Sequence, residues 1–112
     1  MDKKLSPPAQ NLRSSLDAIL SAAKDRPKGF AYIDQVLQDK LKGMASKDML
    51  ALDPPSVDAG IWTNDAGFCR RLGAYLFGVS PESVDELPWQ HLVFFQQIIT
   101  ANFIKSLEAA VP

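Results

Sequence analysis

The sequence predicts an all-α fold, a small helical bundle of four main helices with two short helical turns. Apolar residues recur at three- and four-residue spacing in four segments, near residues 7–24, 30–43, 64–78 and 88–110. Proline and glycine separate these segments, and no stretch shows the strict alternation that is typical of a half-buried strand. Two shorter segments, near residues 47–52 and 81–86, have room for one or two helical turns.

Length and composition indicate one globular domain spanning residues 1–112. Of the 112 residues, 46% are hydrophobic and 22% charged, which suits one modest core and differs from disordered segments. We expect residues 1–5 to be flexible. Residues 53–60 begin with Asp-Pro-Pro-Ser, which ends any preceding helix, so we expect an internal linker there.

The first two predicted helices form amphipathic stripes on either side of a short break. Ser6-Pro7 is typical of a helix start, since the serine hydroxyl can cap free amides and proline suits the first turn. The two apolar stripes comprise Leu12, Leu16, Ile19, Leu20 and Ala23, and then Phe30, Ile33, Val36, Leu37, Leu41 and Met44. Two such helices joined by a short turn usually pack as an antiparallel pair.

The third predicted helix begins after Trp62. Thr63 or Asn64 is a plausible N-cap, and Asp65 suits the helix dipole at that end. We expect Trp62 to pack back on Phe68, as a residue before a cap often does. The inner side of this helix carries Phe68, Cys69, Leu72, Tyr75 and Leu76.

Between the third helix and the last, the chain turns twice. Gly78 can adopt the left-handed conformation that ends a helix, and Ser80-Pro81 repeats the signal for a helix start. Pro88 pushes the preceding residue toward an extended conformation, so the last helix sets off at an angle to the short one. We expect these two corners to hold the last helix in a defined orientation.

The last predicted helix is broadly apolar. Its expected core side comprises Trp89, Leu92, Val93, Phe95, Ile99, Phe103, Ile104 and Leu107. Phe94 and Ile98 project from the opposite side, with Gln90, Gln97, Ala101 and Lys105 as a polar rim. Two large apolar residues on a polar background can mark a contact surface. The alternative is that another helix of the same domain covers them.

Charge and residue pattern count against several classes of function. The formal net charge of −1 offers no general attraction to nucleic acid or anionic lipid. The only histidine, His91, is expected on the outer face of the last helix, and no serine or cysteine has an evident base beside it in sequence. We expect no enzyme, no cofactor and no metal site, and Cys69, the only cysteine, is expected to be a buried thiol.

The sequence also predicts a cytoplasmic protein with no membrane partner. The N-terminal stretch MDKKLSPPAQ has no apolar segment behind its charged start, and no window approaches the length of an apolar membrane span. A lone cysteine fits a reducing compartment.

One stretch resembles a known family. The sequence RLGAYLFGVSPESVDEL, residues 71–87, is followed by a helix containing Phe95-Gln96 and Asn102-Phe103. Over about forty residues this is similar to the C-terminal half of small tail-assembly chaperones of contractile-tailed phages. Members of that family often begin with a strand-rich segment, whereas residues 1–60 here are predicted to be helical. The resemblance implies a cytoplasmic helper that binds a long helical tape-measure protein before tail polymerisation.

We therefore expect a non-enzymatic helical protein-binding module that uses Phe94 and Ile98 as apolar anchors. A phage- or bacterium-encoded adaptor or inhibitor that covers a host or regulatory protein is the alternative, and it would use the same chemistry. Association of copies into a homo-oligomer is a further expectation.

Overall fold

The computed structural model confirms the all-α fold. It describes residues 4–23, 32–55, 62 and 64–110, and these contain six helices and no strand. The four longest are α1 (Pro7–Ala23), α2 (Gln35–Lys42), α5 (Ala66–Phe77) and α7 (Trp89–Ala110), and the short ones are α3 (Ser46–Leu50) and α6 (Pro81–Asp85). The four main helices are accompanied by two short helices where turns were predicted. Most of the expected flexible start at 1–5 and of the linker at 53–60 lies outside the described residues.

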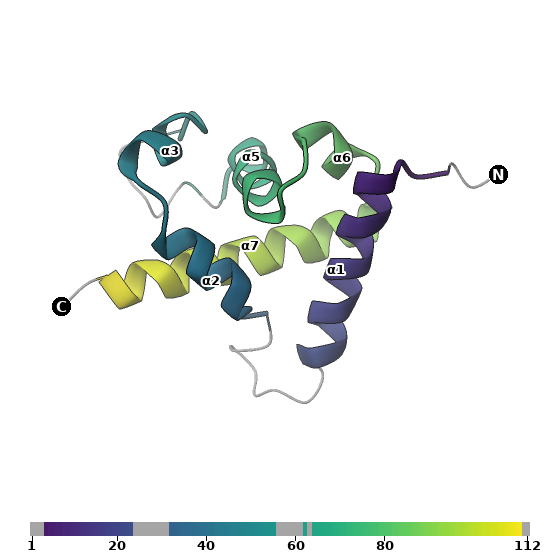
Figure 1. Cartoon of the computed structure of the whole chain (residues 1–112), viewed down its shortest axis with the longest axis horizontal. Helices are drawn as coiled ribbons and strands as arrows, with labels where there is room; N and C mark the ends of the chain where they lie inside the picture. Colours follow the sequence, from purple (N-terminus) through teal and green to yellow (C-terminus); the bar gives the residue numbers. More distant parts are fainter. Residues whose placement is uncertain (1–3, 24–31, 56–61, 63, 111–112) are drawn as a thin grey trace.

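The long helix α7 is the central element against which the others pack. It contacts α5, α2 and α1, while α6 bridges α5 and α1. Figure 1 shows α7 running along the length of the molecule, with α1 crossing its N-terminal end and α2 crossing it nearer the C-terminal end. Every long helix therefore depends on α7 for its position.

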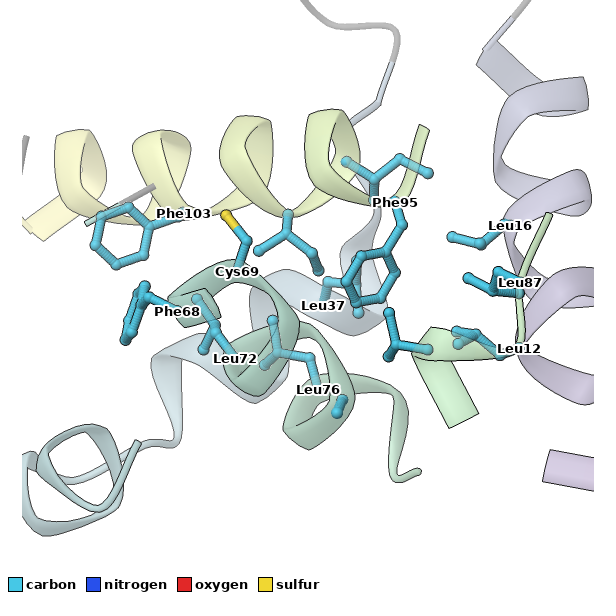
Figure 2. Close-up of a cluster of buried hydrophobic side chains, with 14 of the residues drawn as sticks. Leu12, Leu16, Leu37, Phe68, Cys69, Leu72, Leu76, Leu87, Phe95 and Phe103 are labelled. Atoms are coloured by element: carbon cyan, nitrogen blue, oxygen red, sulfur yellow. The ribbon is translucent and has the colours of Figure 1, made fainter. Parts of the chain in front are cut away.

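One apolar core joins these helices. Figure 2 shows leucines of α1 and α5 meeting the phenylalanines of α7. The core comprises Leu12, Leu16, Leu37, Leu41, Phe68, Cys69, Leu72, Ala74, Leu76, Val84, Leu87, Phe95, Ile98, Ile99 and Phe103. Eleven of these, Cys69 included, lie on the apolar sides predicted from helical spacing. Ile19 and Ile33 are only partly buried, and Val36, Tyr75 and Leu92 are exposed, contrary to prediction.

The start of α1 is held by a residue far away in the sequence. Glu86 accepts hydrogen bonds from the backbone N–H of Ser6 at 3.0 Å and from its hydroxyl at 2.7 Å. The Ser6 hydroxyl was predicted to cap α1 but donates to this carboxylate instead. The first turn of α1 is thereby tied to the end of α6.

Two helices begin later than predicted because an aspartate caps them. Asp34 accepts from the N–H groups of Val36 and Leu37, so α2 starts at Gln35 and not near residue 30. Asp65 accepts from the N–H of Phe68 at 2.8 Å and is the cap of α5, a role assigned to Thr63 or Asn64. Thr63 lies outside the described residues.

The predicted packing of Trp62 on Phe68 is confirmed. Their ring centroids lie 5.4 Å apart in an edge-on arrangement. Trp62 also approaches Phe103 of α7, with ring centroids 6.0 Å apart. The residue before α5 therefore ties the start of that helix to α7.

The double corner before α7 forms with different contacts from those predicted. Gly78 ends α5 in the left-handed conformation at φ 69°, as expected, and Pro81 opens α6. The Ser80 side chain makes no capping bond to the backbone and lies 3.1 Å from the Ser83 hydroxyl. Arg70 of α5 instead fixes α6 by a two-pronged contact with Asp85, with both N–O distances at 2.7 Å.

Candidate protein-binding surface

The structure corrects the predicted orientation of α7. Ile98 is fully buried, so it is core and cannot be an anchor on the surface. Phe94 is half-buried, and its ring lies 6.3 Å from that of His91. Conversely, Trp89, Leu92, Val93, Ile104 and Leu107 were predicted as core and are 41–70% exposed.

Asn102 explains why α7 turns this side inward. This polar side chain is fully buried. Its amide group donates to the carbonyls of Tyr32 and Ile98, each at 2.8 Å. Its side-chain oxygen accepts from the N–H of Asp34 at 3.1 Å and from the Gln38 side chain at 2.9 Å. Since the hydrogen-bonding capacity of this side chain is met, its burial carries no desolvation penalty for an unpaired group.

Exposed side chains gather on one side of α7. At 100° per residue, one arc of about 120° contains Trp89, Leu92, Val93, Gln96, Thr100, Ile104 and Leu107, and the buried Phe103 lies near one edge of the same arc. We call this set the α7 face. Trp89 is 70% exposed, and the other four large apolar residues are each more than 40% exposed. An exposed apolar patch on one rigid helix is a candidate contact surface.

The middle of the α7 face is hollowed. A depression of about 460 Å³ is lined by Val93, Gln96, Gln97, Thr100 and Ala101 of α7, together with Tyr32 and Asn64. Of the predicted rim residues, Gln97 and Ala101 lie in this hollow. Gln90 and Lys105 are exposed on α7 but do not line it.

The signal that could have revealed the α7 face is the width of the apolar arc. Viewed down the axis of α7, apolar side chains occupy an arc of about 280°, with Phe94 at one edge of the arc and Ile104 at the other. The buried residues Ile98, Asn102, Phe95, Ile99 and Phe103 cover only about 140°. A small domain cannot surround such a helix, so some of its apolar side chains must face outward.

His91 is packed against α1 and is not on the outer face as predicted. Its Nε2 lies 2.9 Å from a carboxylate oxygen of Asp17, and its side chain is only 14% exposed. The other ring nitrogen, Nδ1, is buried without a hydrogen-bond partner. No described hydroxyl or thiol is therefore placed for activation by this imidazole, as a nucleophile would require.

Cys69 is likewise placed for packing. Burial raises the pKa of its thiol, which disfavours the reactive thiolate.

Among the described residues, no three His, Cys, Asp or Glu side chains cluster as metal ligands would. The described helices include none with the length and apolar character needed to cross a membrane.

Comparisons with protein-family models, with curated proteins and with solved structures find no match to this chain.

Proposed function

We propose that this chain is a non-enzymatic protein-binding module that holds a helical segment of its partner on the α7 face. The observation that carries this proposal is the alignment of five exposed large apolar side chains along one helix. Exposed apolar side chains scattered singly are ordinary, but two groups of them on the same side of one helix are typical of an interaction site.

The shape of the α7 face suits a helix. Trp89 and Leu107 lie eighteen residues apart, which places them about 27 Å from each other along α7. Apolar side chains stand at both ends, and the hollow lies between them. A partner helix with apolar residues at three- and four-residue spacing would bury these anchors, as in other helix-in-groove complexes.

Polar groups in the middle would set orientation. The hollow presents the side-chain amides of Gln96 and Gln97, which can donate and accept hydrogen bonds. No member of the α7 face carries a charge. Affinity would therefore come from apolar burial, with the amides selecting register.

The resemblance of residues 71–87 to tail-assembly chaperones points to a long helical tape-measure-type partner. In this chain those residues form the end of α5, the Gly78 turn and α6. They support the start of α7 and thus the position of Trp89. An adaptor that covers a regulatory protein would use the same face, so the identity of the captured partner distinguishes the two.

The test compares two double variants in a pull-down from the native source, read by mass spectrometry. Val93→Glu with Ile104→Glu places charges on the α7 face. Val36→Glu with Leu50→Glu is the matched control, because these residues are 60% and 67% exposed and lie on α2 and α3. We expect the first variant to lose the partner and the control to keep it, with both folded by circular dichroism.

A folded α7-face variant that captures every protein captured by the unaltered chain would overturn the proposal. Recovery of a long coiled-coil tail protein that depends on the α7 face would identify the chaperone role. Recovery of a host enzyme or regulator would identify the adaptor role.

A further inference from the structure

We infer that the α7 face also binds a second copy of this chain, with two α7 helices packed antiparallel about a two-fold axis. This inference rests on the proposed function, because it names one helix that fits the same face. Three features of α7 carry it: the order of residues along the face, the charges at its ends and its area.

The α7 face has the same order of apolar and polar side chains when it is read from either end of the helix. In an antiparallel pair centred between residues 96 and 100, Trp89 lies opposite Leu107 of the second copy and Val93 lies beside its Ile104. Gln96 lies opposite Thr100 at the centre. Large apolar side chains therefore meet large apolar side chains at both ends, and polar meets polar in the middle. A polar pair within an apolar helix contact favours one register over others.

The charges at the ends favour antiparallel packing over parallel packing. α7 has no acidic residue in its first turn and no basic residue in its last turn, so its own sequence leaves both ends of its dipole uncompensated. In the antiparallel pair the N-terminus of each α7 lies beside the C-terminus of the second α7, an arrangement in which the two dipoles attract. In a parallel pair like ends of the two dipoles would lie together and repel.

The centre of the face adds no repulsion. Gln96, Thr100 and the five large apolar residues are uncharged, and the chain as a whole carries a formal charge of −1. Two copies can therefore approach without bringing like charges together along the contact.

The area sets the expected strength. A contact of about 27 Å by 10–12 Å on each copy would bury on the order of 1,000 Å² in total accessible surface. This is near the lower limit for specific association and well below that of obligate dimers. We therefore expect a reversible dimer with a dissociation constant in the range of roughly 1–100 μM, weak enough for another helix to displace the second copy.

Analytical ultracentrifugation of the full chain tests the dimer. Between about 0.2 μM and 1 mM, a range that brackets the expected constant, the unaltered chain should shift from monomer to dimer. Val93→Glu with Ile104→Glu should stay monomeric over the same range, while Val36→Glu with Leu50→Glu should dimerise like the unaltered chain. An unaltered chain that stays monomeric throughout, or an α7-face variant that still dimerises, overturns the inference.

Disulfide trapping tests the direction of packing. Val93→Cys and Ile104→Cys proteins should form a mixed disulfide when combined, whereas neither should cross-link with itself. In the antiparallel pair the two copies of position 93 lie about 15 Å apart along the axis, beyond the reach of a disulfide. The native Cys69 is buried and does not compete. Cross-linking of Val93→Cys with itself would show parallel packing and overturn the inference.

The two proposals can fail separately. A monomeric chain whose α7-face variant still loses a partner in the pull-down removes the homodimer and leaves the protein-binding function in place. A dimer abolished by the α7-face variant, in a chain whose captured proteins do not change, removes the partner-binding function and leaves the homodimer.

Discussion

At Gly73 the ring of Phe95 from α7 packs directly against the backbone of α5. A Cβ placed on this glycine would lie 2.0 Å from the Cζ atom of Phe95, and two further ring atoms would lie within 2.8 Å. Both residues are in the core, so the ring has nowhere to move without disturbing its neighbours. The small residue is therefore a requirement of packing, despite its low helix propensity.

We expect Gly73→Ala to lower the free energy of unfolding by about 1–3 kcal/mol, because overpacking outweighs the gain in helix propensity. Urea denaturation followed by circular dichroism measures the change. Gly43→Ala is the control, since a Cβ there would meet only backbone oxygens at 3.6 Å and 3.7 Å. Equal stabilities of the two variants would mean that α5 and α7 are not so closely packed.

Ile98 and Val93 test which side of α7 is buried. Ile98→Ser should cost several kcal/mol, roughly 3–5, because a core side chain is replaced by a cavity and a hydroxyl. Val93→Ser should cost less than about 1 kcal/mol, since Val93 is 44% exposed in the monomer. Thermal melts at low protein concentration, where the monomer dominates, give both values. The reverse order would restore the orientation predicted from helical spacing.

At the scale of elements, α6 connects the outer ends of two long helices. The Asp85 carboxylate accepts a hydrogen bond from Arg70 of α5. The Glu86 carboxylate, just beyond α6, accepts hydrogen bonds from Ser6 at the start of α1. Both connections are electrostatic, and both lie close to the start of α7.

The Arg70–Asp85 pair should contribute stability only above the acid range. The hydrogen bonds from Arg70 lower the pKa of the Asp85 carboxyl below its usual value. A carboxyl with a lowered folded-state pKa stabilises the fold above its unfolded pKa of about 3.9 and loses that contribution as pH falls through the lower folded value. Because the side chains are 33% and 56% exposed, we expect no more than about 1 kcal/mol.

Comparing Arg70→Ala with the unaltered chain by urea denaturation at several pH values checks this. The stability difference should be present at pH 7 and should shrink toward zero well below about pH 4. Arg13→Ala, which removes an exposed arginine of α1, should show no such change with pH. A difference that stays constant from neutral to acidic pH would rule out the ion pair as its cause.

At the scale of the whole molecule, association should be insensitive to salt. The α7 face is uncharged, and the attraction between antiparallel helix dipoles is a small term that salt screens. Raising sodium chloride from about 0.05 M to 0.5 M should therefore change the dimer dissociation constant less than about threefold. Ultracentrifugation at the two salt concentrations measures this. A tenfold or greater weakening would indicate a contact made through charged groups elsewhere on the surface.

Sequence alone determined the features that depend on neighbouring residues. Helical spacing located all four long helices, with starts shifted by at most a few residues except in α2. Gly78 ends α5 as expected, because only a residue without a side chain adopts a left-handed conformation at little cost. Leu12 and Leu16 of α1 and Leu72 and Leu76 of α5 are buried as helical spacing predicts, because each of those helices has one narrow apolar stripe.

Tertiary structure decided the orientation of α7, and with it the candidate surface. Apolar residues surround most of that helix, so spacing cannot select the buried side. The choice depends on partners distant in sequence: Asn102 satisfies groups around α2, and His91 reaches Asp17 of α1. These contacts bury two polar residues and leave Trp89, Val93 and Leu107 outside. Which side faces inward is set by the hydrogen bonds that the neighbouring helices complete, and these exist only once the chain has folded.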